Sequence, residues 1–153
     1  MGVNGDYVGR IFVLPRPYEV EASTLRAFAR AVGVTHPACH DSAAARALGY
    51  SDVVAAPTFG VVIAQKAEAL YLSDPGARID CERVVHAEER FVHTRPLVAG
   101  DVVGAATEVV GIISRGGITQ VTTRSDLTDE ADGHRGVPVA SVWSTLAVRA
   151  ERR

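Results

Sequence analysis

The segment at residues 58–72 constrains the fold more than any other part of the chain, because it predicts a helix that is apolar on nearly every side. It begins at Thr58, just after Pro57, and ends before the turn sequence Ser-Asp-Pro-Gly. Lys66 and Glu68 are its only charged residues. A helix without a polar face has to be buried by structure that surrounds it. The rest of the chain is therefore expected to form a wrapping layer.

Four runs rich in β-branched residues follow this helix and can form that layer. They lie at residues 83–94, 101–114, 117–129 and 136–148, and the connections between them contain Pro-Leu-Val-Ala-Gly-Asp, Arg-Gly-Gly and Glu-Ala-Asp-Gly. Short connections of this kind between long strands predict antiparallel hairpins. A long apolar helix followed by such a meander predicts an α+β fold, in which a curved antiparallel sheet wraps a central helix.

The residues before the apolar helix predict an edge segment and two shorter helices. Residues 11–20 have an extended composition, but their two prolines exclude a central strand, so we expect a lead-in segment or an edge strand. Ser23 predicts the N-cap of the first short helix. Asp41 or Ser42 predicts the cap of a second, Ala-rich helix that stops at Gly49.

Length and composition limit the class of protein. With 153 residues the chain can form one domain, spanning residues 1–153, that buries a core without disulfide or metal support. A formal charge of −2 without a basic stripe argues against nucleic acid as a partner. Cys39 and Cys81 have no CxxC spacing, so we expect both to be reduced in a cytoplasmic protein. The apolar stretch at residues 53–63 is too short to cross a membrane. The sequence also contains no Gly-rich phosphate loop after a strand, so no cofactor is expected.

Four separated motifs agree in order and spacing with one known family. They are His-Pro-Ala at 36–38, Ala-Leu-Gly-Tyr at 47–50, Ala-Pro-Thr-Phe at 56–59 and Arg-Pro-Leu-Val-Ala-Gly-Asp at 95–101. The chain resembles the MaoC-like hotdog hydratases and dehydratases, and most of all their small actinobacterial members, formerly an uncharacterised protein family. The resemblance implies a hotdog fold, an acyl-CoA or acyl-carrier-protein thioester as ligand, and a homodimer or heterodimer. Several such relatives are non-catalytic halves of heterodimeric (3R)-hydroxyacyl-carrier-protein dehydratases in long-chain fatty-acid elongation.

The catalytic signature of that family, Gly-Asp-x-Asn-Pro-x-His, is altered in this chain. In active relatives the Asp and the His hold the water that adds across the enoyl double bond, and they act as its acid and base. Aligned on the shared proline, Val34 falls on the Asp, His36 on the Asn and Cys39 on the His. Pro57 falls on a glycine whose N–H stabilises the enolate-like oxygen in active relatives, and proline has no N–H. The resemblance thus implies an acyl site without the family's acid–base pair.

A shift of register does not restore the pair, because His40 would need an acid at Thr35 and His36 one at Ala31. His36 and His40 are nevertheless the candidate catalytic residues, and the alternative is that both are structural loop residues. A metal site built from His36, Cys39 and His40 matches no common zinc spacing, so no metal is expected.

Cys39, Tyr50, Pro57, Thr58 and Phe59 are the candidate substrate-binding residues around the acyl tunnel that the resemblance implies. Thr58 offers a hydroxyl and an N–H to a thioester carbonyl, with capping of its own helix as the alternative. The two aromatic residues could line the tunnel or belong to the core.

Outside these motifs, His86 and His93 lie in one predicted strand an odd number of residues apart, so they are expected to face opposite sides of the sheet. His93 with Arg95 could meet the phosphate of a phosphopantetheine or a carrier protein, and an exposed strand end is the alternative. Glu68 lies too far along its helix to be the early-helix carboxylate of hotdog thioesterases.

Three functional hypotheses follow. The first is a catalytically degenerate subunit that shapes the acyl channel of a catalytic MaoC-like partner, the pair dehydrating a (3R)-3-hydroxyacyl thioester to the trans-2-enoyl thioester. The second is a homodimeric acyl-binding module without catalysis. The third is an active hydratase or thioesterase that uses His36 or His40. The sequence leaves open the acyl chain length, the carrier and the composition of the dimer.

Overall fold

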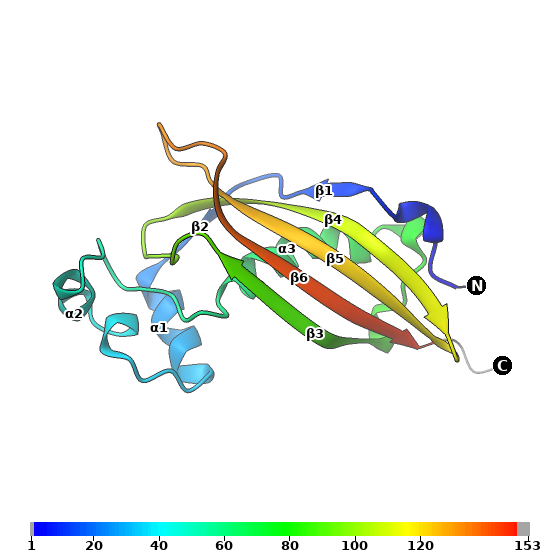
Figure 1. Ribbon diagram of the computed structural model, residues 1–153, viewed down its shortest axis with the longest axis horizontal. Coiled ribbons are helices and arrows are strands. Elements are labelled where there is room, and N and C mark those ends of the chain that lie inside the picture. Colours follow the sequence, from blue (N-terminus) through cyan, green and yellow to red (C-terminus); the bar gives the residue numbers. More distant parts are fainter. Residues whose placement is uncertain (1, 150–153) are drawn as a thin grey trace.

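The structure, a computed structural model, describes residues 2–149 and has a mixed α+β architecture (Figure 1). The strands and α-helices of this range follow in the order β1 (Ile11–Val13), β2 (Tyr18–Glu19), α1 (Ala22–Ala31), α2 (Ser42–Ala47), α3 (Gly60–Leu72), β3 (Val84–His93), β4 (Val102–Arg115), β5 (Ile118–Asp129) and β6 (Val137–Arg149). The four long strands lie within one residue of their predicted bounds.

All strand pairs of the sheet are antiparallel, and the strand order is β1-β4-β5-β6-β3, with β2 also paired to β4. The segment that contains Pro15 and Pro17 lies between the two short strands at one edge, as the prolines predicted. β3 forms the opposite edge. The predicted α+β fold, with a curved antiparallel sheet and a central helix, is confirmed.

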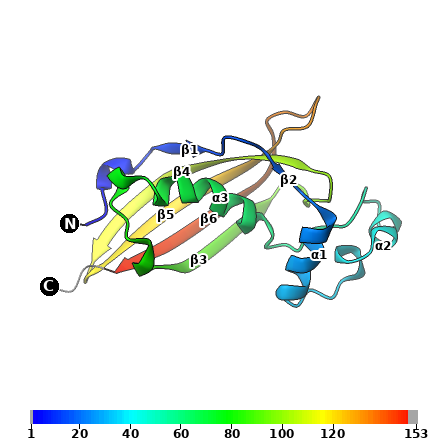
Figure 2. The ribbon, with the colours of Figure 1, turned by 180° about the vertical axis from the view of Figure 1, so that it is seen from behind.

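Helix α3 packs on the inner side of the sheet, against β1, β4, β5 and β6 (Figure 2). Phe59, Ile63 and Tyr71 are fully buried there. The sheet covers only one side of the helix, however, and the side that faces away from it remains exposed at Gln65, Lys66, Ala69 and Leu70. The sheet of a single chain therefore wraps the helix in part and leaves one side of it uncovered.

Two predicted helix starts are also wrong. Helix α1 has Glu21 as its N-cap residue without a side-chain bond, and Ser23 lies inside the first turn rather than before it. Helix α3 begins at Gly60, because Pro57 and Thr58 form a separate turn that precedes it. By contrast, Asp41 caps α2 as predicted, since its Oδ1 accepts a hydrogen bond from the N–H of Ala43 (3.0 Å). Among the helices of the described range, none is both long and apolar enough to span a membrane.

Candidate functional site

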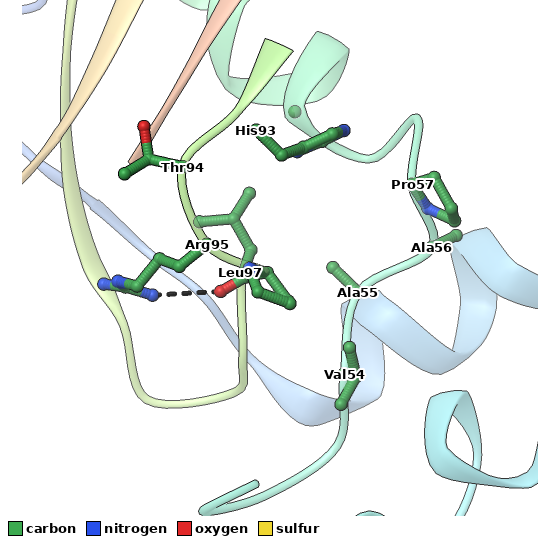
Figure 3. Close-up of a pocket in the computed structure, with 10 residues that line it drawn as sticks. Val54, Ala55, Ala56, Pro57, His93, Thr94, Arg95 and Leu97 are labelled. Atoms are coloured by element: carbon green, nitrogen blue, oxygen red, sulfur yellow. Dashed lines mark hydrogen bonds between the residues drawn. The ribbon is translucent and has the colours of Figure 1, made fainter. Parts of the chain in front are cut away.

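An open pocket of about 360 Å³ lies at the amino-terminal end of α3 (Figure 3). One wall consists of residues 54–57, which lead toward the helix, together with Gly60. The other consists of residues 93–97, which begin at the last residue of β3. Most of the lining side chains are aliphatic: Val54, Ala55, Ala56, Pro57, Pro96 and Leu97. A concave and mostly apolar site with few polar groups is typical of a ligand pocket.

Backbone hydrogen bonds fasten the two walls to each other. The N–H of Ala55 donates to the carbonyl of Leu97 (2.9 Å), and the N–H of Ala99 donates to the carbonyl of Val53 (2.9 Å). These bonds join segments that are far apart in the sequence. The pocket is therefore a product of the tertiary fold rather than of one local motif.

Arg95 fixes the second wall instead of presenting its charge to the pocket. Its guanidinium donates to the carboxylates of Asp101 (2.8 Å) and Asp129 (2.9 Å) and to the carbonyl of Pro96 (3.1 Å). Hydrogen bonding to Asp101, which outweighs the opposing desolvation, raises the pKa of Arg95. Figure 3 shows its side chain directed away from residues 54–57. The positive charge of Arg95, which was considered for phosphate binding, is thus already balanced by the carboxylates of Asp101 and Asp129.

His93 is the titratable side chain that faces the pocket. In Figure 3 its ring projects from the end of β3 toward the wall that contains Pro57. The ring is stacked on that of Phe91, with centroids 6.1 Å apart and an interplanar angle of 3°. The sequence placed this histidine at a strand end, but only the contact between the two walls shows that it borders a cavity.

The prediction that His86 and His93 face opposite sides of the sheet is wrong. A β-bulge between His86 and Glu88 changes the alternation of the strand. His86 is then opposite Leu146 and His93 is opposite Ala140, both of which are buried, so both histidines lie on the inner side. A bulge adds one residue to one strand only, and the sequence contains no signal that places it.

The loop between α1 and α2 uses both candidate catalytic histidines to fix its own backbone. Nδ1 of His36 accepts a hydrogen bond from the N–H of Ala38 (3.2 Å) and so caps the 3-10 helix η2 (Pro37–Cys39). Nε2 of His40 donates to the carbonyl of Val34 (2.6 Å). Neither ring lines the pocket described above. A catalytic role for either histidine remains a prediction.

Cys39 lies in the same loop and is buried, with 6% of its surface exposed. Burial raises the pKa of its thiol, so the thiolate that would act as a base or nucleophile is disfavoured. The loop is bonded to the pocket wall, because the N–H of Val54 donates to the carbonyl of Ala38 (2.9 Å). Cys39 is thus tied to the pocket through the backbone without lining it.

Of the remaining candidates, Pro57 lines the pocket, whereas Tyr50, Thr58 and Phe59 do not. Thr58 is exposed in the turn before α3, and Tyr50 is half-buried. Phe59 is fully buried and packs edge-on against Phe28, with centroids 5.3 Å apart. A substrate contact for these three residues stays a prediction. The sequence analysis did not name Gly60, which lines the pocket. A signal for it existed, because the first residues of a helix carry N–H groups without partners in the helix.

A second polar group lies between α3 and the sheet near the edge formed by β3. Glu68 of α3 is 2% exposed and accepts a hydrogen bond from the hydroxyl of Thr123 (2.7 Å). Glu89 accepts from the hydroxyl of Ser144 (2.8 Å) and from Nδ1 of His86 (2.8 Å). Burial is the main cause that raises the pKa of Glu68, and the charge of Glu89 adds to it.

Comparison with known proteins gives one consistent result. A family model for the FAS1-like dehydratase domain region matches residues 6–142. The UPF0336 protein of Clavibacter michiganensis subsp. michiganensis is 42% identical over 151 residues, which cover 99% of both chains.

Solved structures give the same picture. The chain is similar to one in the C-terminally truncated HadBC (3R-hydroxyacyl-ACP dehydratase) complex from Mycobacterium tuberculosis, with a TM-score of 0.81 and 31% identity over 93% of this chain and 97% of that chain. It is also similar to a MaoC-like dehydratase, with a TM-score of 0.79 and 30% identity over 94% of this chain and 42% of that chain. Sequence and fold thus agree on one group of proteins.

Proposed function

The chain belongs to the MaoC-like hotdog family, and from this membership we propose that it is the acyl-binding, catalytically degenerate subunit of a dehydratase pair. Its ligand is the acyl chain of a (3R)-3-hydroxyacyl thioester carried by coenzyme A or by an acyl carrier protein. The second subunit is a catalytic MaoC-like chain, and the pair acts in fatty-acid elongation in the cytoplasm.

One observation carries the proposal, namely an apolar pocket combined with an inert loop. The pocket at the start of α3 has aliphatic walls suited to an acyl chain. The residues aligned with the family's acid and base, Val34 and Cys39, are an aliphatic side chain and a thiol whose pKa burial raises. A side chain that does not ionise near neutral pH cannot relay the proton that the reaction requires.

The chemistry of the pair follows from what this chain lacks. Dehydration removes a proton from the α-carbon and protonates the departing hydroxyl group, so it needs a base and an acid at hydrogen-bond distance from the substrate. Both groups come from the catalytic subunit. This chain contributes apolar surface that binds and orients the acyl chain, which lowers the entropic cost of reaching the reactive geometry.

Two surfaces of the chain are suited to contact with a partner subunit. Within residues 2–149 no strand pairs with the edge of β3 that faces away from β6, so this edge is suited to strand addition. The side of α3 that the sheet does not cover exposes Ala69 and Leu70, the latter at 36%. The structure with a TM-score of 0.81 to this chain is named as a complex, and we extend that arrangement to this protein.

The test uses the chain together with the catalytic MaoC-like subunit of the same genome, co-expressed and purified as a complex. We expect the complex to hydrate trans-2-enoyl-CoA substrates, followed as loss of the absorbance of the conjugated double bond. Val54→Trp, which fills the pocket, is expected to lower turnover of long-chain substrates at least about tenfold, a barrier change of roughly 1.4 kcal/mol. Val32→Trp, at the exposed end of α1, is the matched control. Wild-type turnover of long chains by the Val54→Trp complex would contradict an acyl role for the pocket.

A second candidate function, an active hydratase, is favoured by the position of His93. Its ring faces the pocket and could exchange a proton with a bound ligand. In the chain without a partner, turnover that disappears in His93→Ala but not in His36→Ala or His40→Ala would support this candidate. A wild-type chain that is inactive alone eliminates it.

A further inference from the structure

We propose that the pocket at the start of α3 also binds free long-chain carboxylic acids, with the hydrocarbon chain between the two walls and the carboxylate at the ring of His93. This binding strengthens as the pH falls from about 8 to about 6. The inference rests on the proposed acyl pocket and adds a regulation of the same site, namely competition between a free acid and the acyl thioester.

His93 lies at the rim of the pocket, where a polar head group can contact it and still reach water (Figure 3). It is the last residue of β3, and it is exposed. The pocket behind it is lined mainly by aliphatic groups. An amphiphile binds a site of this kind with its chain against the apolar walls and its head group toward solvent.

The ring of His93 has no counter-charge within residues 2–149. No hydrogen bond or ion pair engages it there, and its ring contact is the stacking on Phe91. The segments next to it contain no titratable side chain, neither residues 54–57 of the facing wall nor residues 138–142 of the paired strand β6. Helix α3 has none before Lys66, more than one turn beyond its start.

The charged groups nearest in the sequence are already engaged elsewhere. Arg95 is bound by two carboxylates and is directed away from the pocket. Arg90 lies over the ring of Trp143, with its guanidinium carbon 4.0 to 4.5 Å away at 4.2 Å from the ring centroid. The carboxylate of Asp52 accepts hydrogen bonds from the hydroxyl of Ser42 (2.7 Å) and from the backbone N–H that follows it (2.7 Å). A proton on His93 therefore adds a positive charge that these groups do not neutralise.

A free acid and a thioester differ in charge at the rim of the pocket. The thioester group is uncharged, and the phosphates of its carrier lie at the far end of the pantetheine arm. A free acid carries its negative charge on the carbon next to the chain. A carboxylate brought to an apolar pocket needs a partner that compensates its lost hydration. The imidazolium of His93 supplies this partner to the free acid and contacts no charge on the thioester.

The sign of the pH dependence follows from the two titrating groups. Between about pH 8 and about pH 6 a histidine side chain gains its positive charge, while an aliphatic carboxylic acid stays ionised. The attraction is therefore present at the lower pH and is lost as the pH rises. An ion pair at an exposed rim is weak, so we expect a roughly two- to fivefold change in the dissociation constant.

The experiment measures binding of decanoate to the full chain by isothermal titration calorimetry at about pH 6 and about pH 8. We expect the dissociation constant to be roughly two- to fivefold lower at the lower pH. Decanol, an uncharged ligand with the same chain length, is expected to show no such change. Decane-1-sulfonate is anionic at both pH values and is expected to behave like decanoate, which excludes protonation of the ligand as the cause.

His93→Gln keeps a polar side chain without the titration, and we expect it to lose the pH dependence of decanoate binding. His134→Gln, in the exposed connection between β5 and β6, is the matched control and is expected to retain it. Circular dichroism confirms that each variant is folded. Equal pH dependence in the wild type and in His93→Gln overturns the inference. Undiminished decanoate binding by Val54→Trp, whose new side chain fills the pocket, also overturns it.

The proposed function is tested separately, by turnover of the complex. A chain that binds decanol in the pocket but shows no pH-dependent preference for decanoate refutes this inference alone. An inactive complex whose isolated chain binds decanoate through His93 refutes the proposed function alone.

Discussion

The carboxyl group of Glu68 is buried because the helix that carries it packs directly on the sheet. The hydroxyl of Thr123 satisfies one of its oxygens at 2.7 Å, but burial still raises its pKa. A carboxyl with a raised native pKa binds its proton more tightly in the folded state than in the unfolded state. The free energy of unfolding therefore falls as the pH rises through the interval between the unfolded and the native pKa of this group.

Glu68→Gln removes this pH-dependent penalty and can still accept the hydrogen bond from Thr123. We expect the variant to have a higher Tm than the wild type at pH 8. The two Tm values should converge in acid, at about pH 4 and below, where the carboxyl is protonated in both states. Thermal unfolding from pH 4 to pH 8 tests this, with the exposed Glu19→Gln as control. A lower Tm of Glu68→Gln at pH 8 would show that the charged carboxylate stabilises the fold.

A second prediction at the residue scale follows from the alignment of Val34 and Cys39 with the family's acid and base, and it concerns hydratase activity. The triple variant Val34→Asp/Cys39→His/Pro57→Gly restores the acid, the base and the backbone N–H. We expect it to hydrate trans-2-enoyl-CoA at least about 100-fold faster than the wild-type chain, which is the lower range for general acid–base catalysis. Thr35→Asp, which pairs an acid with His40 one residue out of register, is the matched control. A folded triple variant without any gain would show that the alignment of this loop is wrong.

At the scale of elements, the four long strands could be predicted because their β-branched runs and Gly-rich turns specify the same structure locally. The features that could not be predicted depend on neighbouring elements. Helix α3 begins at Gly60 rather than Thr58 because the preceding turn is bonded to itself, with the N–H of Phe59 donating to Ala56 (2.9 Å). The bulge in β3 arises from pairing with β6, and it reversed the predicted orientation of one histidine relative to the other.

One contact between short elements allows a stability test. The 3-10 helix η3 (Pro75–Ala77) follows α3, and a Cβ added at Gly76 would collide with the hydroxyl oxygen of Tyr7, a buried residue. We expect Gly76→Ala to lower the free energy of unfolding by roughly 1–3 kcal/mol, as overpacked substitutions do. Gly5→Ala, where nothing lies within 4 Å of the new Cβ, is the control. Equal stability of the two variants in urea unfolding would contradict the contact.

At the scale of the whole molecule, the pocket combines a wall before α3 with a wall after β3, and no single stretch of sequence specifies it. Four motifs predicted the family, and one candidate, Pro57, lines the pocket. His93 was considered only as a strand end, because its position beside residues 54–57 depends on long-range hydrogen bonds such as that from Ala55 to Leu97. The exposed side of α3 likewise appears only in the folded chain.

The decisive measurement is hydration of a trans-2-enoyl-CoA by the purified chain, first alone and then with the catalytic MaoC-like subunit of the same genome. If the chain is an acyl-binding subunit without its own acid–base pair, it shows no turnover above background alone, and activity appears with the partner. Clear turnover by the chain alone would contradict the proposal, and it would move the search for the catalytic base to His93, His36 and His40.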